Sequence, residues 1–194
     1  MVRGQPAGIS GLQTRREMSR PQFQPEQAKE IARAFADEGV EYVFIGKSAA
    51  ILLGYPASSQ EVQVFPEKSP ANGARIVAAL RRVGFEINDE LEDAITRGKD
   101  FVQIKNGPFD VDLVFAPDGI ENFAAAKARS LELDGFHIAN LRDIIASKRA
   151  SGREKDLLDL PLLERFREEY ERMNPPALRS AADVAAQRIQ KTKS

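Results

Sequence analysis

The 194-residue sequence contains no cysteine and no tryptophan, and it has a single histidine, His137. Without cysteine the chain has no disulfide, no zinc-thiolate site and no cysteine nucleophile. One histidine excludes a metal site built from several histidines, and we interpret His137 as a packed or surface residue rather than a catalytic base. With no tryptophan and only three tyrosines, the composition gives little support for an aromatic surface on which nucleic-acid bases stack.

Long apolar runs and an excess of charge of one sign are also absent. No apolar run approaches the roughly 18 residues of a membrane-spanning helix. The first 20 residues lack the apolar segment of a secretory signal, so we expect a cytoplasmic protein with no membrane partner. The 28 basic and 29 acidic residues give a net charge of −1. This balance neither requires nor excludes nucleic acid, because a neutral chain can carry a local basic groove.

The composition along the chain predicts one domain with two flanking segments. Residues 1–24 are rich in Gly, Gln, Arg and Pro without a period, which is typical of a disordered segment. The domain is expected over residues 25–168, followed by a C-terminal helical tail over residues 169–194. For this tail three interpretations stay open: a helix docked on the domain, a helix for a partner, or a frayed end.

Apolar periodicity predicts interleaved helices and strands within the domain. The expected helices are residues 25–38, 47–55, 69–85, 140–148 and about 153–173, and the expected strands are residues 41–46, 58–65, 100–106 and 109–117. Gly107 and Pro108 predict a hairpin between the last two strands. The fold class is therefore α+β, with a mixed sheet flanked by helices. Four phenylalanines are expected in the hydrophobic core: Phe101, Phe109, Phe115 and Phe123.

Four polar side chains on two of these strands form the first candidate site. Glu61 and Gln63 are two residues apart, as are Asp110 and Asp112, so each pair shares one face of its strand. An isolated pair of this kind is typical of a solvated strand. If the two strands are neighbours in the sheet, however, three carboxylates converge. That arrangement suits a divalent metal ion and a nucleoside triphosphate.

Two further features concern anions. Gly46 stands between a buried strand and a helix, where backbone N–H groups can face a phosphate, although a tight turn explains it better when it is taken alone. A P-loop is excluded because it needs a glycine at the position of Glu41. The second feature is a basic cluster followed by two acids: Lys148, Arg149, Arg153, Lys155, Asp156 and Asp159. It is either a helix junction held by ion pairs or a basic flank for phosphates.

Together these pieces resemble the nucleotidyltransferase fold, a palm like that of polymerase beta, and in particular the AbiEii-like and minimal nucleotidyltransferases of prokaryotes, several of which are toxins. The family signature is an apolar strand ending in Gly-Gly or Gly-Ser, then Asp-x-Asp, then a third acid on a later strand. "FIGK", thirteen residues, "EVQ" and then "FDVDLVF" follow this order. "LRDIIASKRASGREKDLLDLPLL" resembles the lysine-bearing helix of the family. The resemblance covers about residues 26 to 168.

The resemblance implies a role for each matching residue. The implied catalytic residues are Glu61, Gln63 and Asp112, the implied nucleotide or phosphate ligands are Gly46, Lys47, Ser48 and Lys148, and the implied metal ligands are Glu61, Asp110 and Asp112. Lys47 stands where the family has a small residue. Glu61 and Gln63 stand where the family has paired aspartates. The sequence therefore departs from the family pattern at the residues that would carry out the reaction.

In the family's reaction two Mg²⁺ ions clamp the attacking oxygen and the triphosphate. Gln63 has no charge with which to bridge two dications, and the stem of Glu61 is longer than that of aspartate by roughly 1.5 Å. A misplacement of about 1 Å can cost on the order of 100-fold in rate. We therefore expect a pseudoenzyme with lost or reduced transferase activity and weakened or lost Mg²⁺ binding. It would bind a nucleotide, an RNA or an antitoxin-like protein partner.

The alternative is an active, toxin-like nucleotidyltransferase. It would use Glu61, Asp110 and Asp112 on one metal ion and transfer a nucleotidyl group from a nucleoside triphosphate to RNA, protein or a small molecule.

Overall fold

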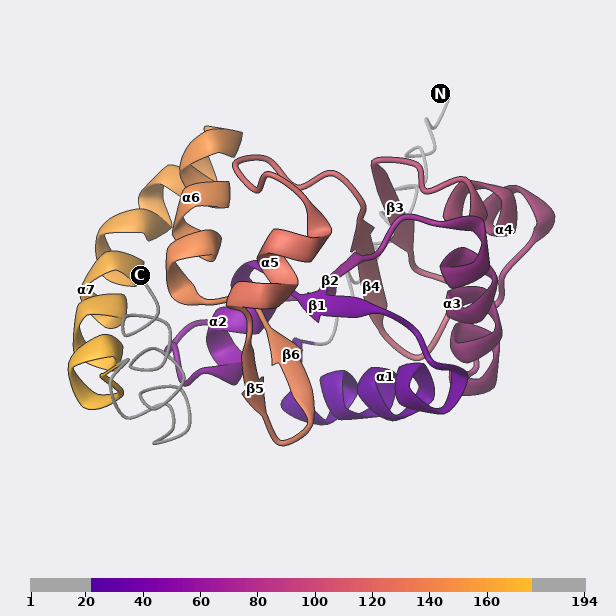
Figure 1. Cartoon of the computed structure of the whole chain (residues 1–194), viewed down its shortest axis with the longest axis horizontal. Coiled ribbons are helices and arrows are strands. Elements are labelled where there is room, and N and C mark those ends of the chain that lie inside the picture. Colours follow the sequence, from indigo (N-terminus) through magenta and orange to yellow (C-terminus); the bar gives the residue numbers. More distant parts are fainter. Residues whose placement is uncertain (1–21, 176–194) are drawn as a thin grey trace, which may run out of the picture.

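A six-stranded mixed sheet forms the centre of the computed structural model, which describes residues 22–175 (Figure 1). The strand order is β3-β4-β2-β1-β6-β5. The strands are β1 (Tyr42–Phe44), β2 (Glu61–Pro66), β3 (Phe101–Ile104), β4 (Asp110–Val114), β5 (Leu131–Leu133) and β6 (Phe136–Ile138). β2 pairs with β4 and β1 with β6 in parallel, while the other neighbours are antiparallel. The predicted mixed sheet flanked by helices is confirmed.

Seven helices of the described residues surround this sheet. They are α1 (Pro25–Glu38), α2 (Gly46–Leu52), α3 (Pro70–Val83), α4 (Asp89–Thr96), α5 (Phe123–Arg129), α6 (Leu141–Ser151) and α7 (Glu154–Met173). Figure 1 shows α6 and α7 packed together at one end of the molecule and α3 with α4 at the other. Each predicted helix and strand occurs. α4, α5, β5 and β6 were not among the expected elements.

The predicted domain boundary at residue 168 falls inside α7, which continues to Met173. The expectations for residues 1–21 and 176–194 lie outside the described residues. Within residues 22–175, no helix combines the length and the apolar character that crossing a bilayer would require.

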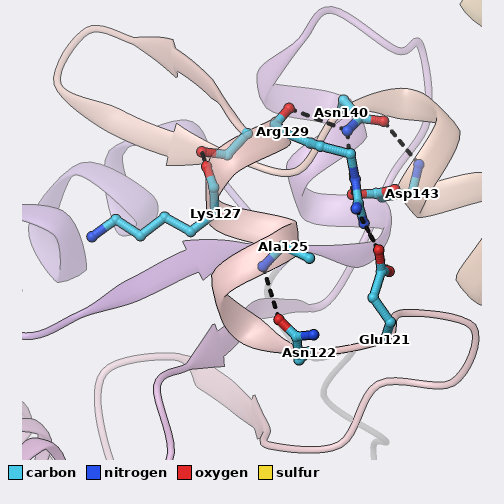
Figure 2. A network of polar contacts seen from close by, with 8 residues as sticks. Glu121, Asn122, Ala125, Lys127, Arg129, Asn140 and Asp143 are labelled. Atoms are coloured by element: carbon cyan, nitrogen blue, oxygen red, sulfur yellow. Dashed lines mark hydrogen bonds and ion pairs between the residues drawn. The ribbon is translucent and has the colours of Figure 1, made fainter.

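A polar network fixes the start of α6, the helix that carries Lys148 (Figure 2). Asn140 caps α6 by accepting a hydrogen bond from the Asp143 N–H at 2.9 Å, and its amide donates to the carbonyl oxygen of Arg129 at 3.2 Å. The Arg129 guanidinium bridges Glu121 and Asp143. An N-cap of this kind is worth about 1 kcal/mol. The network therefore ties α6 to the end of α5 and holds its direction.

Alternation along the strands separates a core face of the sheet from a polar face. Val62 and Val64 of β2, and Val111 and Leu113 of β4, are fully buried. Their neighbours in sequence point to the opposite side because successive side chains of a strand alternate. The polar face thus carries the predicted site residues of β2 and β4.

The core assignment of the phenylalanines is confirmed except at one position. Phe109 and Phe115 are buried, and Phe123 packs edge-on against Phe65 at the margin of the core. Phe101, in contrast, is 49 % exposed. The prediction was wrong for Phe101 because Val102 occupies the core face of the edge strand β3, which leaves Phe101 on the polar face.

Candidate active site

Strands β2 and β4 bring the four predicted polar side chains onto one face of the sheet. The parallel register places Glu61 opposite Asp110 and Gln63 opposite Asp112. Directly opposite residues of neighbouring strands point to the same side, with their Cβ atoms roughly 5 Å apart. β3 adds Gln103 opposite Asp112. Asp112 therefore lies between two amides, and the carboxylates of Glu61 and Asp110 lie one step further along the strands.

Asp112 is only 4 % exposed. Burial raises its pKa from 3.8 to about 6, and the negative charges of Glu61 and Asp110 act in the same direction. Hydrogen bonds from Gln103 and Gln63 oppose this rise in pKa, and Gln103 Nε2 donates to Asp112 Oδ1 at 3.2 Å. A carboxylate with a raised pKa beside other carboxylates holds its proton more readily than a solvated one.

No group of three or more carboxylate or histidine side chains in residues 22–175 is arranged to hold a metal ion. The assignment of Glu61, Asp110 and Asp112 as metal ligands therefore stays a prediction.

Gln63 reaches from β2 into the glycine turn at the start of α2. The backbone N–H of Lys47 donates to Gln63 Oε1 at 3.2 Å, and α2 has no side-chain cap from its own N-cap residue, Ile45. Gly46 has φ +66°, and a Cβ at this position would lie 1.8 Å from Gln63 Oε1. The close approach therefore requires glycine. An oxygen of the protein itself occupies the turn that the sequence predicted for a phosphate.

Ser48 is fully buried and does not reach the solvent. Its hydroxyl donates to the carbonyl oxygen of Ile45 at 3.3 Å and accepts the backbone N–H of Gln63 at 3.0 Å. The Ile45 N–H donates in turn to the Gln63 carbonyl at 3.0 Å. Both functions of the hydroxyl are thus used in joining α2 to β2.

The two predicted phosphate-binding lysines meet on one carboxylate of α7. Asp159 Oδ2 lies 2.6 Å from Lys47 Nζ and 3.3 Å from Lys148 Nζ. Lys148 is buried and also contacts Asp156 Oδ1 at 2.7 Å. Ion pairs thus cross the α6–α7 junction, but those of Lys148 join residues eight and eleven positions apart rather than the three or four expected within one helix. The role of the basic cluster as a flank for phosphates stays a prediction.

A cavity of about 420 Å³ lies over the polar face of the sheet, against α6 and the start of α7. The predicted site residues that line it are Gly46, Lys47, Glu61, Gln63 and Lys148, whereas Ser48, Asp110 and Asp112 are not in its lining. Its charged lining residues are Lys47, Lys148, Arg153, Lys155, Glu61, Asp118, Asp156 and Asp159. Four cations thus meet four carboxylates, so the cavity as a whole is electrically balanced.

One end of the cavity is apolar and was not expected from the sequence. Phe101 and Val114 face each other on β3 and β4, and both line the cavity together with Pro117. A signal for this existed in the alternation "FVQI". Phe101 shares its face with the polar Gln103, while Val102 and Ile104 share the core face.

No protein family model matches the sequence, and no curated protein sequence matches it. Two solved structures from Helicobacter pylori are similar to the model. The protein JHP933 is 19 % identical, with a TM-score of 0.46 over 75 % of this chain and 66 % of that one. A protein described as a proposed nucleotidyltransferase is 17 % identical, with a TM-score of 0.47 over 75 % and 68 %. This chain spans about two thirds of their length. At these TM-scores neither likeness supports an argument about function.

Proposed function

We propose that this chain is a nucleotidyltransferase-like protein that binds a nucleotide in the cavity over β2 and β4 and has lost or greatly reduced transferase activity. The observation that carries the proposal is the position of Gln63. Its side-chain oxygen accepts a hydrogen bond from the Lys47 N–H, and the residue lies opposite Asp112 in the register of β2 and β4. It stands where the family resemblance requires a charged ligand shared by two metal ions.

The donor set does not fit a pair of magnesium ions. Mg²⁺ favours charged oxygen ligands in nearly ideal octahedral geometry. Gln63 offers one neutral carbonyl oxygen, which already accepts a hydrogen bond. At the paired position Gln63 therefore supplies one negative charge fewer than an aspartate would, which weakens the attraction for dications.

Two features support the binding of a nucleotide and do not depend on metal ions: the volume of the cavity and its basic side chains. The cavity volume of about 420 Å³ lies within the range of roughly 300–1,000 Å³ that is usual for small-molecule sites. Four basic side chains line it, and those of Arg153 and Lys155 are on exposed residues. These groups can attract the phosphates of a nucleotide from solvent.

An active, metal-dependent enzyme is the second candidate, because the register does place Glu61 and Asp110 beside Asp112 on one face. It would transfer a nucleotidyl group from a nucleoside triphosphate to RNA, protein or a small molecule. Loading of one dication onto these three carboxylates is the feature that separates it from the binding protein.

Calorimetric titration of the full chain with each of the four nucleoside triphosphates, with and without Mg²⁺, tests the proposal. A parallel assay with α-labelled triphosphates measures transfer to RNA or protein. We expect binding that does not depend on Mg²⁺ and no transfer. Labelling of an acceptor only in the presence of Mg²⁺ would establish the second candidate, and failure of all four triphosphates to bind would refute both.

A further inference from the structure

We infer that Phe101 is the surface on which the base of the bound nucleotide stacks, so that the ligand lies across the sheet with its base on β3 and its phosphates beside Lys47 and Lys148. This inference rests on the proposed nucleotide-binding function and adds to it the orientation and the chemical class of the ligand.

The first support is the exposure of Phe101. Its side chain is 49 % exposed and belongs to the cavity lining, on the edge strand β3. An aromatic ring left in water forgoes the free energy that its burial would provide. A flat ligand placed on the ring recovers this free energy and adds a favourable stacking geometry. The neighbouring Val114 and Pro117 extend the same apolar surface.

The second support is the distribution of residue types across the sheet. Moving inward from the edge, the lining passes from Phe101 on β3 to Val114 on β4 and Gln63 on β2, and then to Gly46 after β1. Three steps of roughly 4.8 Å between strands give about 14 Å across the sheet, and the two-residue offset between Val114 and Asp112, the partner of Gln63, adds about 7 Å along the strands. The cavity therefore has an apolar aromatic end and a charged end separated by the length of a small extended ligand.

The third support is a set of neutral polar side chains in the cavity lining. Ser58, Ser59 and Gln60 precede β2 and line the cavity together with Glu61. Hydroxyl and amide groups are neutral hydrogen-bonding partners, as a ribose requires. A ligand that carries a planar apolar group, hydroxyl groups and an anionic group finds a partner for each of them in this lining. Inorganic phosphates and simple sugar phosphates leave the aromatic end in water.

Calorimetry on the full-length chain with ATP, adenosine and inorganic tripolyphosphate tests this assignment. In the parent protein ATP should bind more tightly than tripolyphosphate. Phe101→Ala should weaken ATP binding by between about 5-fold and 150-fold, the loss that corresponds to stacking of one base on an aromatic side chain. The affinity for tripolyphosphate should stay within twofold, because the charged end is untouched. Phe101→Tyr keeps the ring and should retain ATP binding.

The matched control is Leu158→Ala, which removes an apolar side chain that is 76 % exposed on α7 and is not in the cavity lining. It should leave all three affinities unchanged. Equal ATP affinity in Phe101→Ala and the parent would overturn the assignment, as would equal affinity of the parent for ATP and tripolyphosphate.

The same preparations separate this assignment from the proposed function. Mg²⁺-dependent transfer of a nucleotidyl group by the parent would refute the proposed loss of activity. The effect of Phe101→Ala on ATP binding would still test the base site. If tripolyphosphate binds, adenosine does not bind and ATP binds no more tightly than tripolyphosphate, the base site is refuted and a phosphate-binding cavity remains. Absence of binding by all three probes would refute both.

Discussion

The carboxylate of Asp159 on α7 is ion-paired with the ammonium group of Lys47 on α2 at 2.6 Å. The same oxygen reaches Lys148 of α6 at 3.3 Å. One acidic side chain therefore neutralises both lysines that the sequence predicted for phosphate binding. An anionic ligand that uses these lysines has to compete with Asp159, and the affinity for such a ligand should depend on this residue.

Replacement of Asp159 by asparagine should increase the affinity for ATP and for tripolyphosphate several-fold. The change removes a competing charge, and an ion pair with partly exposed partners is worth up to about 1 kcal/mol. Titration calorimetry at low salt measures the effect. Glu164→Gln is the matched control because it removes one charge from the same helix, where Glu164 pairs with Arg149 and is not in the cavity lining. An equal gain in affinity in both variants would show a general effect of charge and would contradict competition between Asp159 and the ligand.

The contact between Gly46 and Gln63 predicts a non-additive pair of substitutions. Gly46→Ala should lower the free energy of unfolding by more than the roughly 1–2 kcal/mol of a left-handed alanine, because its Cβ meets Gln63 Oε1. In a Gln63→Ala background the extra cost should disappear. Urea unfolding of the single and double variants measures the coupling, which should be about 0.5–1 kcal/mol or more.

Gly39 provides the control for this coupling. It has φ +68°, close to the +66° of Gly46, but a Cβ on it would meet nothing within 4 Å. Gly39→Ala therefore carries the backbone strain without the clash. Its cost should be the same with Gln63 and with Ala at position 63. If the effects of Gly46→Ala and Gln63→Ala on the free energy of unfolding are also additive, the side chain of Gln63 does not fill the turn in solution.

The raised pKa of Asp112 predicts a pH-dependent effect on stability. Between its ordinary pKa of 3.8 and the folded value of about 6, the folded state binds more protons at this residue than the unfolded state. The contribution of Asp112 to stability is therefore most favourable below about pH 4 and is lost as the pH rises through 6. Asp112→Asn should match the parent near pH 4 and exceed its stability at pH 7 by on the order of 2 kcal/mol.

Urea unfolding at several values of pH between 4 and 7 tests the effect of Asp112→Asn. Asp118→Asn serves as the control, since it removes one carboxylate from an exposed position of the same cavity lining. A stability difference for Asp112→Asn that does not change with pH would show that the carboxylate titrates normally.

The strand pattern was enough to predict the face on which the candidate site lies. The alternation in "EVQVF" and in "DVDLV" sets which side chains share a face, and the two strands proved to be neighbours in register. The number of residues between two strands does not show whether the strands are neighbours in the sheet. The pairing of Gln63 with Asp112 was therefore a conditional expectation until the sheet order was known.

The partners of the charged and amide side chains were less predictable. The sequence placed Gln63 among the metal positions, but it did not predict that its amide would serve as the cap of α2. Nor did it predict that Asp159 would join Lys47 and Lys148. The hydrogen bonds and ion pairs of long side chains depend on which residues the tertiary fold places around them. Periodicity along the sequence does not show which residues these are. Phe101 was misassigned for a different reason: the alternation in "FVQI" places it on the polar face with Gln103, whereas the expectation followed the general tendency of phenylalanine to be buried.

Rebuilding the acidic pair tests whether this strand belongs to a metal site. Glu61→Asp together with Gln63→Asp restores two aspartates to the matched positions and adds one negative charge beside Asp112. Without metal we expect the double variant to be less stable than the parent by about 1–2 kcal/mol, because the turn at Gly46 loses its hydrogen bond from Lys47 to Gln63 and a buried carboxylate gains a charged neighbour. Mg²⁺ should reverse this loss.

The measurement is urea unfolding of the parent and the double variant at increasing Mg²⁺ concentrations, because a ligand that binds only the folded state stabilises it by about 2.7 kcal/mol at 100 times its dissociation constant. The control is Glu61→Asp with Gln60→Asp, which has the same net charge but places the new carboxylate outside the paired position. Mg²⁺ should stabilise the Gln63→Asp double variant, while the parent and the control should change little. If all three proteins respond equally to Mg²⁺, Glu61 and Gln63 do not occupy metal positions. The proposed descent of this cavity from a nucleotidyltransferase site would then lose its main support, because no other pair of residues on β2 could have bridged two metal ions on the face shared with Asp112.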